Sequence, residues 1–416
     1  MKNIIKKISA RQILDSRGNP TVEATVEAEN GAIGVAQVPS GASKGKLEAL
    51  ELRDNNPHYF GGKSVLKAVQ NVNDCINKLL CGADVFEQFE NDYAMLNADG
   101  TDEKSNFGAN AILSVSSAMA KCAANSLNIP LYKYFGGINA HILPVPMINI
   151  LNGGAHADND LDIQEFMIMP LRFNTFDEAI AASYEVFNAL KSVLKKEGLS
   201  TSVGDEGGFA PELENAEQAI IAIMNAIESA GYNFEQIKIA LDCAASEYWQ
   251  DGVYEFENNE FTSVEMAEYL SDLTHKYPIY SIEDGMASDD TEGWLSLSEK
   301  LKDKVMLVGD DLMVTNPVLI EKFALMNIAN SVLIKPNQIG TISETIMAIE
   351  TARNFNYKTI VSHRSGDTCD SMIADLAVGM NSGFIKTGSL TRAERTSKYN
   401  RLLQIENMLQ ANAKYY

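Results

Sequence analysis

The sequence has no long apolar run. In the chain of 416 residues, no apolar run approaches the roughly 20 residues that are needed to cross a bilayer. The basic N-terminus continues into Arg11 and Asp15, without the apolar segment that a secretory signal contains. We therefore expect neither a membrane span nor a signal peptide.

Cysteine is also scarce. The five cysteines are an odd number, and no two of them form a C-x-x-C pair. This pattern argues against a disulfide framework and against a zinc site. It favours buried, reduced thiols and a cytoplasmic location.

Positive charge is the third deficit. Lys and Arg number 34 against 56 Asp and Glu, which gives a formal net charge of −22. A surface of this sign repels nucleic-acid phosphates, so we expect no nucleic-acid partner. If the substrate is itself an anion, the protein needs a local cluster of Lys and Arg side chains to bind it.

The length predicts one large domain and a smaller one. The glycines and prolines of residues 134–146 mark the best boundary between them. We therefore predict an α+β domain over residues 1–138 and a second domain over residues 139–416. In the first, residues 4–38 have the alternation of strands, and residues 63–80 and 108–126 are predicted helices.

The second domain alternates short apolar runs with amphipathic stretches. The runs are residues 237–241, 278–282, 305–309, 331–334, 359–362 and 383–385. Capping boxes that would begin helices are predicted at Thr175/Glu178, Thr262/Glu265, Thr341/Glu344 and Thr391/Glu394. Buried strands alternating with helices predict a parallel sheet. The size favours a (β/α)8 barrel, although periodicity alone leaves an open doubly wound sheet possible.

An ionisable residue follows each apolar run. In chain order these are Asp242, Glu283, Asp310, Lys335, His363 with Arg364, and Lys386. The carboxyl ends of barrel strands meet at one mouth, where catalytic residues lie. Strands often end in polar loop residues, which would explain any one of these positions. This general tendency explains poorly why the first three strands end in carboxylates and the last three end in cations.

These residue types suggest a binding site for a metal ion and another for an anion. Three of the strand ends carry carboxylates, namely Asp242, Glu283 and Asp310. A group of carboxylates without histidine or cysteine suits a hard cation such as Mg²⁺ or Mn²⁺. The opposite wall, with Lys335, Lys386, Arg364 and the adjacent Ser365, suits a phosphate or carboxylate. Together they point to a small phosphorylated carboxylic acid as substrate.

Two further carboxylates stand apart from the strand ends. Glu165 and Glu206 could share one proton, which would raise the pKa of one of them and make a general acid. Glycine-rich loops at residues 39–45 and 152–158 could close over the same mouth. Each loop taken alone is more often an ordinary turn.

Nine segments, in order between about residues 8 and 406, resemble the enolase family. They are residues 15–23, 40–43, 152–156, 204–209, 281–285, 309–311, 337–341, 362–366 and 386–388. The resemblance implies a (β/α)8 barrel whose second strand is antiparallel, with a smaller N-terminal α+β domain. It also implies a glycolytic and gluconeogenic lyase that reversibly dehydrates 2-phospho-D-glycerate to phosphoenolpyruvate.

The resemblance assigns roles to individual residues. It implies that Lys335 is the catalytic base and that Glu206 is the acid, supported by Glu165. Arg364 and Ser365 would hold the phosphate. Nearby cations would disfavour the ammonium form of Lys335, which would free it to act as a base.

The remaining implied roles concern the metal and the substrate carboxylate. Lys386 would face that carboxylate, and His156 lies in the second closing loop. Two Mg²⁺ ions are implied, the second arriving with substrate and held partly by Ser43. The ligands of the first would be Asp242, Glu283 and Asp310.

Several positions depart from the family pattern. Lys44 and Asp367 replace the usual Thr and Glu, and Pro336 follows the implied base. Enolases are typically homodimers, but Gln404 and Asn407 stand where charged partners of Glu23 and Arg11 are usual. We expect a homodimer with a weaker ionic contribution. Two alternatives stay open, namely a related barrel enzyme acting on a non-phosphorylated acid and a binding protein that kept the fold.

Overall fold

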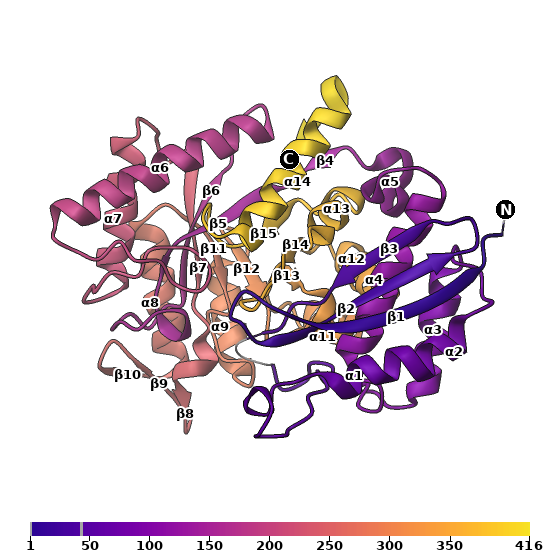
Figure 1. Ribbon diagram of the computed structural model, residues 1–416. Coiled ribbons are helices and arrows are strands. Elements are labelled where there is room, and N and C mark those ends of the chain that lie inside the picture. The colour runs from indigo at the N-terminus through magenta and orange to yellow at the C-terminus, as the bar shows by residue number, and fades with distance from the viewer. Residues whose placement is uncertain (1, 42–44) are drawn as a thin grey trace.

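The chain folds into a closed barrel with a smaller unit beside it, as the computed structural model of residues 2–41 and 45–416 shows (Figure 1). Eight strands close in the order β11-β12-β13-β14-β15-β5-β6-β7. Their bounds are β5 Val145–Asn152, β6 Glu165–Pro170, β7 Ile237–Asp242, β11 Ile279–Glu283, β12 Met306–Gly309, β13 Ser331–Ile334, β14 Lys358–Ser362 and β15 Phe384–Lys386. The predicted barrel is confirmed, and the open-sheet alternative is excluded.

Strand β6 runs against both of its neighbours, whereas all other pairs in the barrel are parallel. The second barrel strand is therefore antiparallel, as the resemblance implied. Because of this reversal, Glu165 at the start of β6 pairs with Asp242 at the end of β7. A residue that begins one strand thus reaches the mouth where the other strands end.

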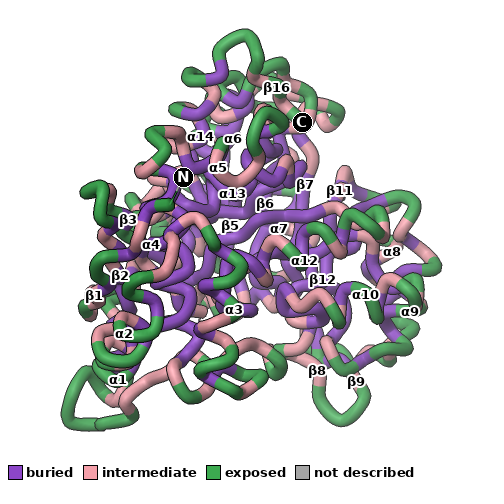
Figure 2. The backbone as a smooth tube through the Cα atoms, turned by 90° about the vertical axis from the view of Figure 1, so that its right-hand side faces the viewer, coloured by how far each residue is buried: buried purple, intermediate pink, exposed green. Residues whose placement is uncertain are grey.

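Helices surround the barrel, and the strands they cover are buried (Figure 2). The helices of this part are α6 Phe176–Lys196, α7 Ala216–Ser229, α8 Ser263–Lys276, α9 Thr291–Leu301, α10 Pro317–Leu325, α11 Pro336–Ile339, α12 Ile342–Asn354, α13 Met372–Gly379 and α14 Ala393–Leu409. Small strands lie outside the barrel, namely β8 Trp249–Gln250, β9 Val253–Phe256, β10 Asn259–Phe261, β4 Ile142–Leu143 and β16 Lys414–Tyr415. Inside the barrel, Met147, Met167, Met169 and Met306 help to fill a separate apolar core.

The N-terminal unit is an antiparallel sheet packed on helices (Figure 1). Its elements are β1 Ile5–Leu14, β2 Pro20–Ala28, β3 Ile33–Gln37, α1 Leu66–Gln70, α2 Asn77–Leu80, α3 Gln88–Asp99, α4 Ala109–Ser126 and α5 Leu131–Gly136, with a π-helix at Asn71–Ile76 between α1 and α2. At Gly34 a Cβ would lie 2.0 Å from the carbonyl oxygen of Ala118, so only glycine lets β3 lie this close to α4.

The N-terminal unit makes close contact with the barrel near the predicted boundary. A Cβ on Gly136 in α5 would lie 1.9 Å from the carbonyl oxygen of Gly379 in α13. The two helices therefore pack backbone to backbone. The division between residues 138 and 139 remains our proposal.

Three of the four predicted helix caps are present. Thr175, Thr262 and Thr341 each accept a backbone N–H three residues on, and only Thr262 forms the complete reciprocal box. The prediction at Thr391 is wrong, because α14 begins later and has no side-chain cap. The Thr391 hydroxyl instead donates to the carbonyl of Gly207 at 2.7 Å.

The cysteines are free, but the expectation that they are buried is wrong for three of them. Cys75, Cys81 and Cys369 are exposed, whereas Cys122 and Cys243 are buried. Within the described residues, no helix combines the length and the apolar character that spanning a bilayer requires.

Candidate active site

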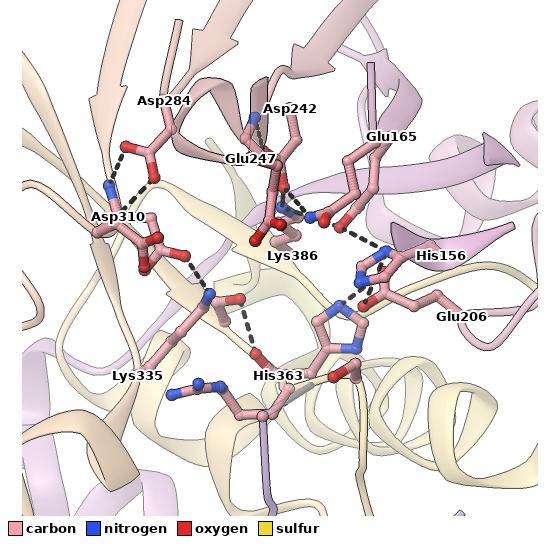
Figure 3. A pocket seen from close by; sticks show the side chains of 17 residues that line it. His156, Glu165, Glu206, Asp242, Glu247, Asp284, Asp310, Lys335, His363 and Lys386 are labelled. Atoms are coloured by element: carbon pink, nitrogen blue, oxygen red, sulfur yellow. Dashed lines mark hydrogen bonds and ion pairs between the residues drawn. The ribbon is translucent and has the colours of Figure 1, made fainter. Parts of the chain in front are cut away.

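A pocket opens at the mouth where the barrel strands end (Figure 3). Nearly all of the side chains that line it are polar or charged. The sequence-predicted residues that line it are His156, Glu165, Glu206, Asp242, Asp310, Lys335, Arg364, Ser365 and Lys386. Glu283 lies at the end of β11 beside them, in contact with Lys386. Residues from strands far apart in the chain therefore meet in one place.

Lys386 is the cation at the centre of the carboxylates. Its Nζ lies 2.7 Å from Oδ2 of Asp242, 2.8 Å from Oε2 of Glu283 and 3.2 Å from Oε1 of Glu165. All four side chains are buried. Burial alone would lower the pKa of Lys386, but the charges of Asp242, Glu165 and Glu283 raise it well above its ordinary value. The three carboxylates therefore favour the charged ammonium form of Lys386.

Lys335 lies against Asp310, and the two form an ion pair. Burial and the charge of Arg364 act to lower the pKa of Lys335. The charges of Asp310 and Glu283 act the other way, and the net effect is a raised pKa. The neighbouring cations Arg364 and Lys386 do lower the pKa of Lys335, as expected, but the carboxylates around it have the larger effect in this structure. Asp310 also accepts a hydrogen bond of 2.9 Å from Nε2 of Gln338, which fixes its orientation.

The carboxylates of the mouth fit a hard cation. Oxygens of Asp284, Asp310 and Asp311 lie within 4.8 Å of one another. Burial, followed by the charge of Asp310, raises the pKa of Asp311 to about 7, because negative charge is crowded there. Oxygen donors with excess buried negative charge are what Mg²⁺ binds. The predicted ligands Asp242 and Glu283 lie on the neighbouring strands β7 and β11, with the Lys386 ammonium between them.

Asp284 has a structural role that was not predicted from the sequence. Its two carboxylate oxygens accept the backbone N–H groups of Asp310 and Asp311, each at 2.9 Å. The φ of Asp284 is +40°, an uncommon value for a residue with a side chain. Asp284 therefore holds the turn that aims Asp310 into the pocket. Its place next to Glu283 in the sequence is the signal that could have identified it.

Glu165 and Glu206 face each other across His156 (Figure 3). Nδ1 of His156 lies 3.6 Å from Glu165 and 3.8 Å from Glu206. Burial and the charge of Glu206 raise the pKa of Glu165 well above its usual range. Burial also acts to raise the pKa of Glu206, but His363 and His156 lower it well below its usual range. One proton shared by this pair therefore lies on Glu165, because two adjacent buried carboxylates cannot both ionise cheaply.

Steric constraints explain why two glycines follow Glu206. Gly207 has a φ of +88°, which disfavours other residues. At Gly208 a Cβ would lie 2.5 Å from Oδ1 of Asn152 and 2.8 Å from Oδ1 of Asn149. The Glu206 turn therefore packs directly on strand β5.

Arg364 and Ser365, the residues predicted to bind the anion, follow β14. Nη1 of Arg364 lies 2.9 Å from Oε2 of Glu48, and its Nη2 lies 3.2 Å from Oε1 of the same residue. A carboxylate three residues beyond the first glycine-rich loop thus pairs with the predicted phosphate-binding guanidinium through two bonds. Glu48 was not predicted as a site residue, and no motif in the sequence singles it out.

The first loop is only partly described. Its Ser40 exchanges backbone hydrogen bonds of 2.7 and 2.9 Å with Gly366, which joins the loop to the segment that carries Arg364. Ser43, the predicted ligand of a second metal, and the departure Lys44 lie outside the described residues. Asp367, another departure, pairs with the buried Lys398 at 3.0 Å.

Sequence models of known families match almost the whole chain. The enolase N-terminal domain matches residues 5–135, and the enolase C-terminal TIM barrel domain matches residues 140–416. The second match agrees with the closed barrel of the structure. The chain belongs to the enolase family.

Proposed function

We propose that this protein reversibly dehydrates 2-phospho-D-glycerate to phosphoenolpyruvate. Membership of the enolase family supports a lyase. The observation that carries the finer proposal is that Lys335, Glu206 and Arg364 line one pocket among buried carboxylates. A base, an acid and a phosphate-binding group are thus within reach of one small substrate.

Lys335 is the proposed base that removes the proton from C2. This proton is weakly acidic because it adjoins a carboxylate, on which more negative charge develops when the proton leaves. The buried ammonium of Lys386 faces that carboxylate in the proposal. It stabilises the developing charge more than the ground state, which is the condition for lowering the barrier.

Glu206 is the proposed acid that protonates the leaving hydroxyl. Glu165 lies beside it and shares a proton with it, and His156 contacts both. In this structure the shared proton lies on Glu165, so it would have to pass to Glu206 before Glu206 could protonate the hydroxyl. Once Glu206 holds the proton, its low pKa favours transfer to the hydroxyl.

Arg364 and Ser365 are proposed to hold the phosphate. The guanidinium now pairs with Glu48, and the substrate phosphate would replace this carboxylate. Binding would therefore move Glu48 and the loop segment that carries it. Such a movement would help to exclude water from the pocket.

Asp242, Glu283 and Asp310 are proposed to hold one Mg²⁺, and Ser43 to contribute to a second that arrives with the substrate. When bound, the metal would supply positive charge beside the substrate carboxylate. It would also take over from Lys335 part of the negative charge of Asp310. Lys335 would then lose its proton more readily.

The reaction and its metal requirement can be tested in one assay. Protein treated with a chelator and then dialysed is expected to form no product from 2-phospho-D-glycerate, as followed by ultraviolet absorbance of the enol product. Addition of Mg²⁺ is expected to restore activity. Equal activity without metal would contradict the metal proposal. Absence of product from folded protein with excess Mg²⁺ would contradict the proposed reaction and favour one of the two alternatives.

We also propose a homodimer that depends little on ion pairs. Arg11 and Glu23 pair with each other at 2.7 Å within one chain, and Glu23 also accepts from Gln37 at 2.8 Å. Gln404 accepts from Arg401 at 2.6 Å. Since these groups have partners within the chain, salt is expected to change the dimer dissociation constant little. Sedimentation velocity at low and high salt measures this, and a stable monomer would contradict the proposal.

A further inference from the structure

Arg395 is a fully buried cation behind the pocket. It is in the first turn of α14 and has no exposed surface. Its Nη1 lies 2.6 Å from the carbonyl oxygen of Arg364, and its Nη2 lies 2.5 Å from that of Ser365 and 3.3 Å from that of Asp205. It therefore joins the phosphate-binding segment to the turn that carries Glu206.

The same guanidinium contacts the ring of His363. Nη1 of Arg395 lies 2.6 Å from Nδ1 of His363. Arginine remains protonated in proteins and can only donate, so Nδ1 must accept and carries no hydrogen. A neutral ring with a bare Nδ1 has its hydrogen on Nε2.

The ring is neutral for two reasons. Burial first, and then the charge of Arg395, lower the pKa of His363 to about 4, against the opposing attraction of Glu206 and Asp367. At neutral pH the imidazole therefore exists as one of its two neutral tautomers. The contact with Arg395 selects between them.

The selected tautomer matters because of where Nε2 points. Nε2 of His363 lies 3.3 Å from Oε2 of Glu206 (Figure 3). With its hydrogen on Nε2, His363 donates to the Glu206 carboxylate and stabilises its anionic form. With the other tautomer, the Nε2 lone pair would face that carboxylate and repel it.

We infer that Arg395 is a positioning residue that fixes His363 in the Nε2–H tautomer, so that His363 donates a hydrogen bond to Glu206. The role extends the proposed function, because it favours the anion that remains when Glu206 gives up its proton. Arg395 itself contacts neither the substrate nor the reacting atoms in this arrangement.

The tautomer can be measured directly in the intact protein without substrate. Two-bond ¹H–¹⁵N correlation spectra of protein labelled with ¹⁵N-histidine distinguish the two neutral forms and the cation. His363→Asn identifies the His363 signals among the five histidines. The native protein at neutral pH is expected to show the Nε2–H pattern for His363. An Nδ1–H pattern or an imidazolium would overturn the inference, even if no arginine variant folds.

Variants of Arg395 test the cause. Arg395→Met, which removes the donors, is expected to lose the Nε2–H pattern, whereas Arg395→Lys, which keeps a donor and the charge, is expected to retain part of it. Arg401→Met is the matched control, because Arg401 lies on the same helix and pairs with Asp375. An unchanged His363 pattern in folded Arg395→Met would overturn the inference. Since no substrate is present, this result is independent of whether the proposed reaction occurs.

Discussion

Replacement of Lys335 by methionine is expected to lower kcat by about 10²- to 10⁴-fold, the usual contribution of a general base. This corresponds to about 3 to 5 kcal/mol of lost transition-state stabilisation. Methionine keeps the length of the side chain but cannot accept a proton from C2. The ultraviolet assay for the enol product, at saturating 2-phospho-D-glycerate and Mg²⁺, measures the loss.

Proton exchange separates the base from other causes of inactivity. In deuterium oxide, Lys335→Met is expected not to exchange the C2 proton of the substrate, as followed by NMR. Lys238→Met is the matched control, because Lys238 lies on β7 (Ile237–Asp242) at the barrel end away from the pocket. It is expected to keep native turnover within about twofold, as is usual for substitutions remote from a site. Native exchange by Lys335→Met would show that another group is the base.

Replacement of Glu206 by glutamine is expected to lower kcat by a similar factor, about 10²- to 10⁴-fold. The amide has the size of the carboxyl group and can still accept the hydrogen bond from His363. It cannot protonate the leaving hydroxyl. The variant should therefore bind substrate and keep its fold while losing the second half of the reaction.

Exchange at C2 should continue in Glu206→Gln, since Lys335 remains in place. The two variants are thus expected to divide the reaction into proton removal and loss of hydroxyl. Glu247→Gln is the control, because Glu247 lines the same pocket, is exposed and has no proposed role. Loss of both exchange and turnover in Glu206→Gln would contradict its assignment as the acid and favour a role in the proton-removal step.

The ion pairs of the pocket explain why metal and substrate binding should be linked. Lys386 and Lys335 now neutralise Asp242, Glu283 and Asp310. A cation bound by these carboxylates would free part of the charge of both lysines for an anionic ligand. Binding of the metal ion would then raise the affinity for the anionic ligand, and binding of that ligand would raise the affinity for the metal by the same factor.

Local sequence patterns predicted six of the eight barrel strands, whereas β5 and β6 were not among the predicted runs. The predicted run at residues 331–334 coincides with β13 (Ser331–Ile334), and the other five runs differ from the observed strands by one residue at one or both ends. Apolar runs and capping residues act over a few neighbouring positions, so they can be seen without the fold. The exception is Thr391, because Arg392 after it has a φ of +67° and α14 begins only at Ala393.

The sequence by itself determined the family, the barrel and the ionisable residues at the strand ends. Motifs and periodicity are properties of short segments, so they can be recognised in the sequence. Because the carboxyl ends of barrel strands lie at one mouth, residues at those ends can be predicted to form a site. Only the tertiary structure decided which charges pair within that mouth. Lys386 contacts Asp242, which is 144 positions away, and Arg395 contacts His363, which is 32 positions away. Such pairs, and the pKa values that they set, depend on distances and burial that arise only when the whole chain has folded.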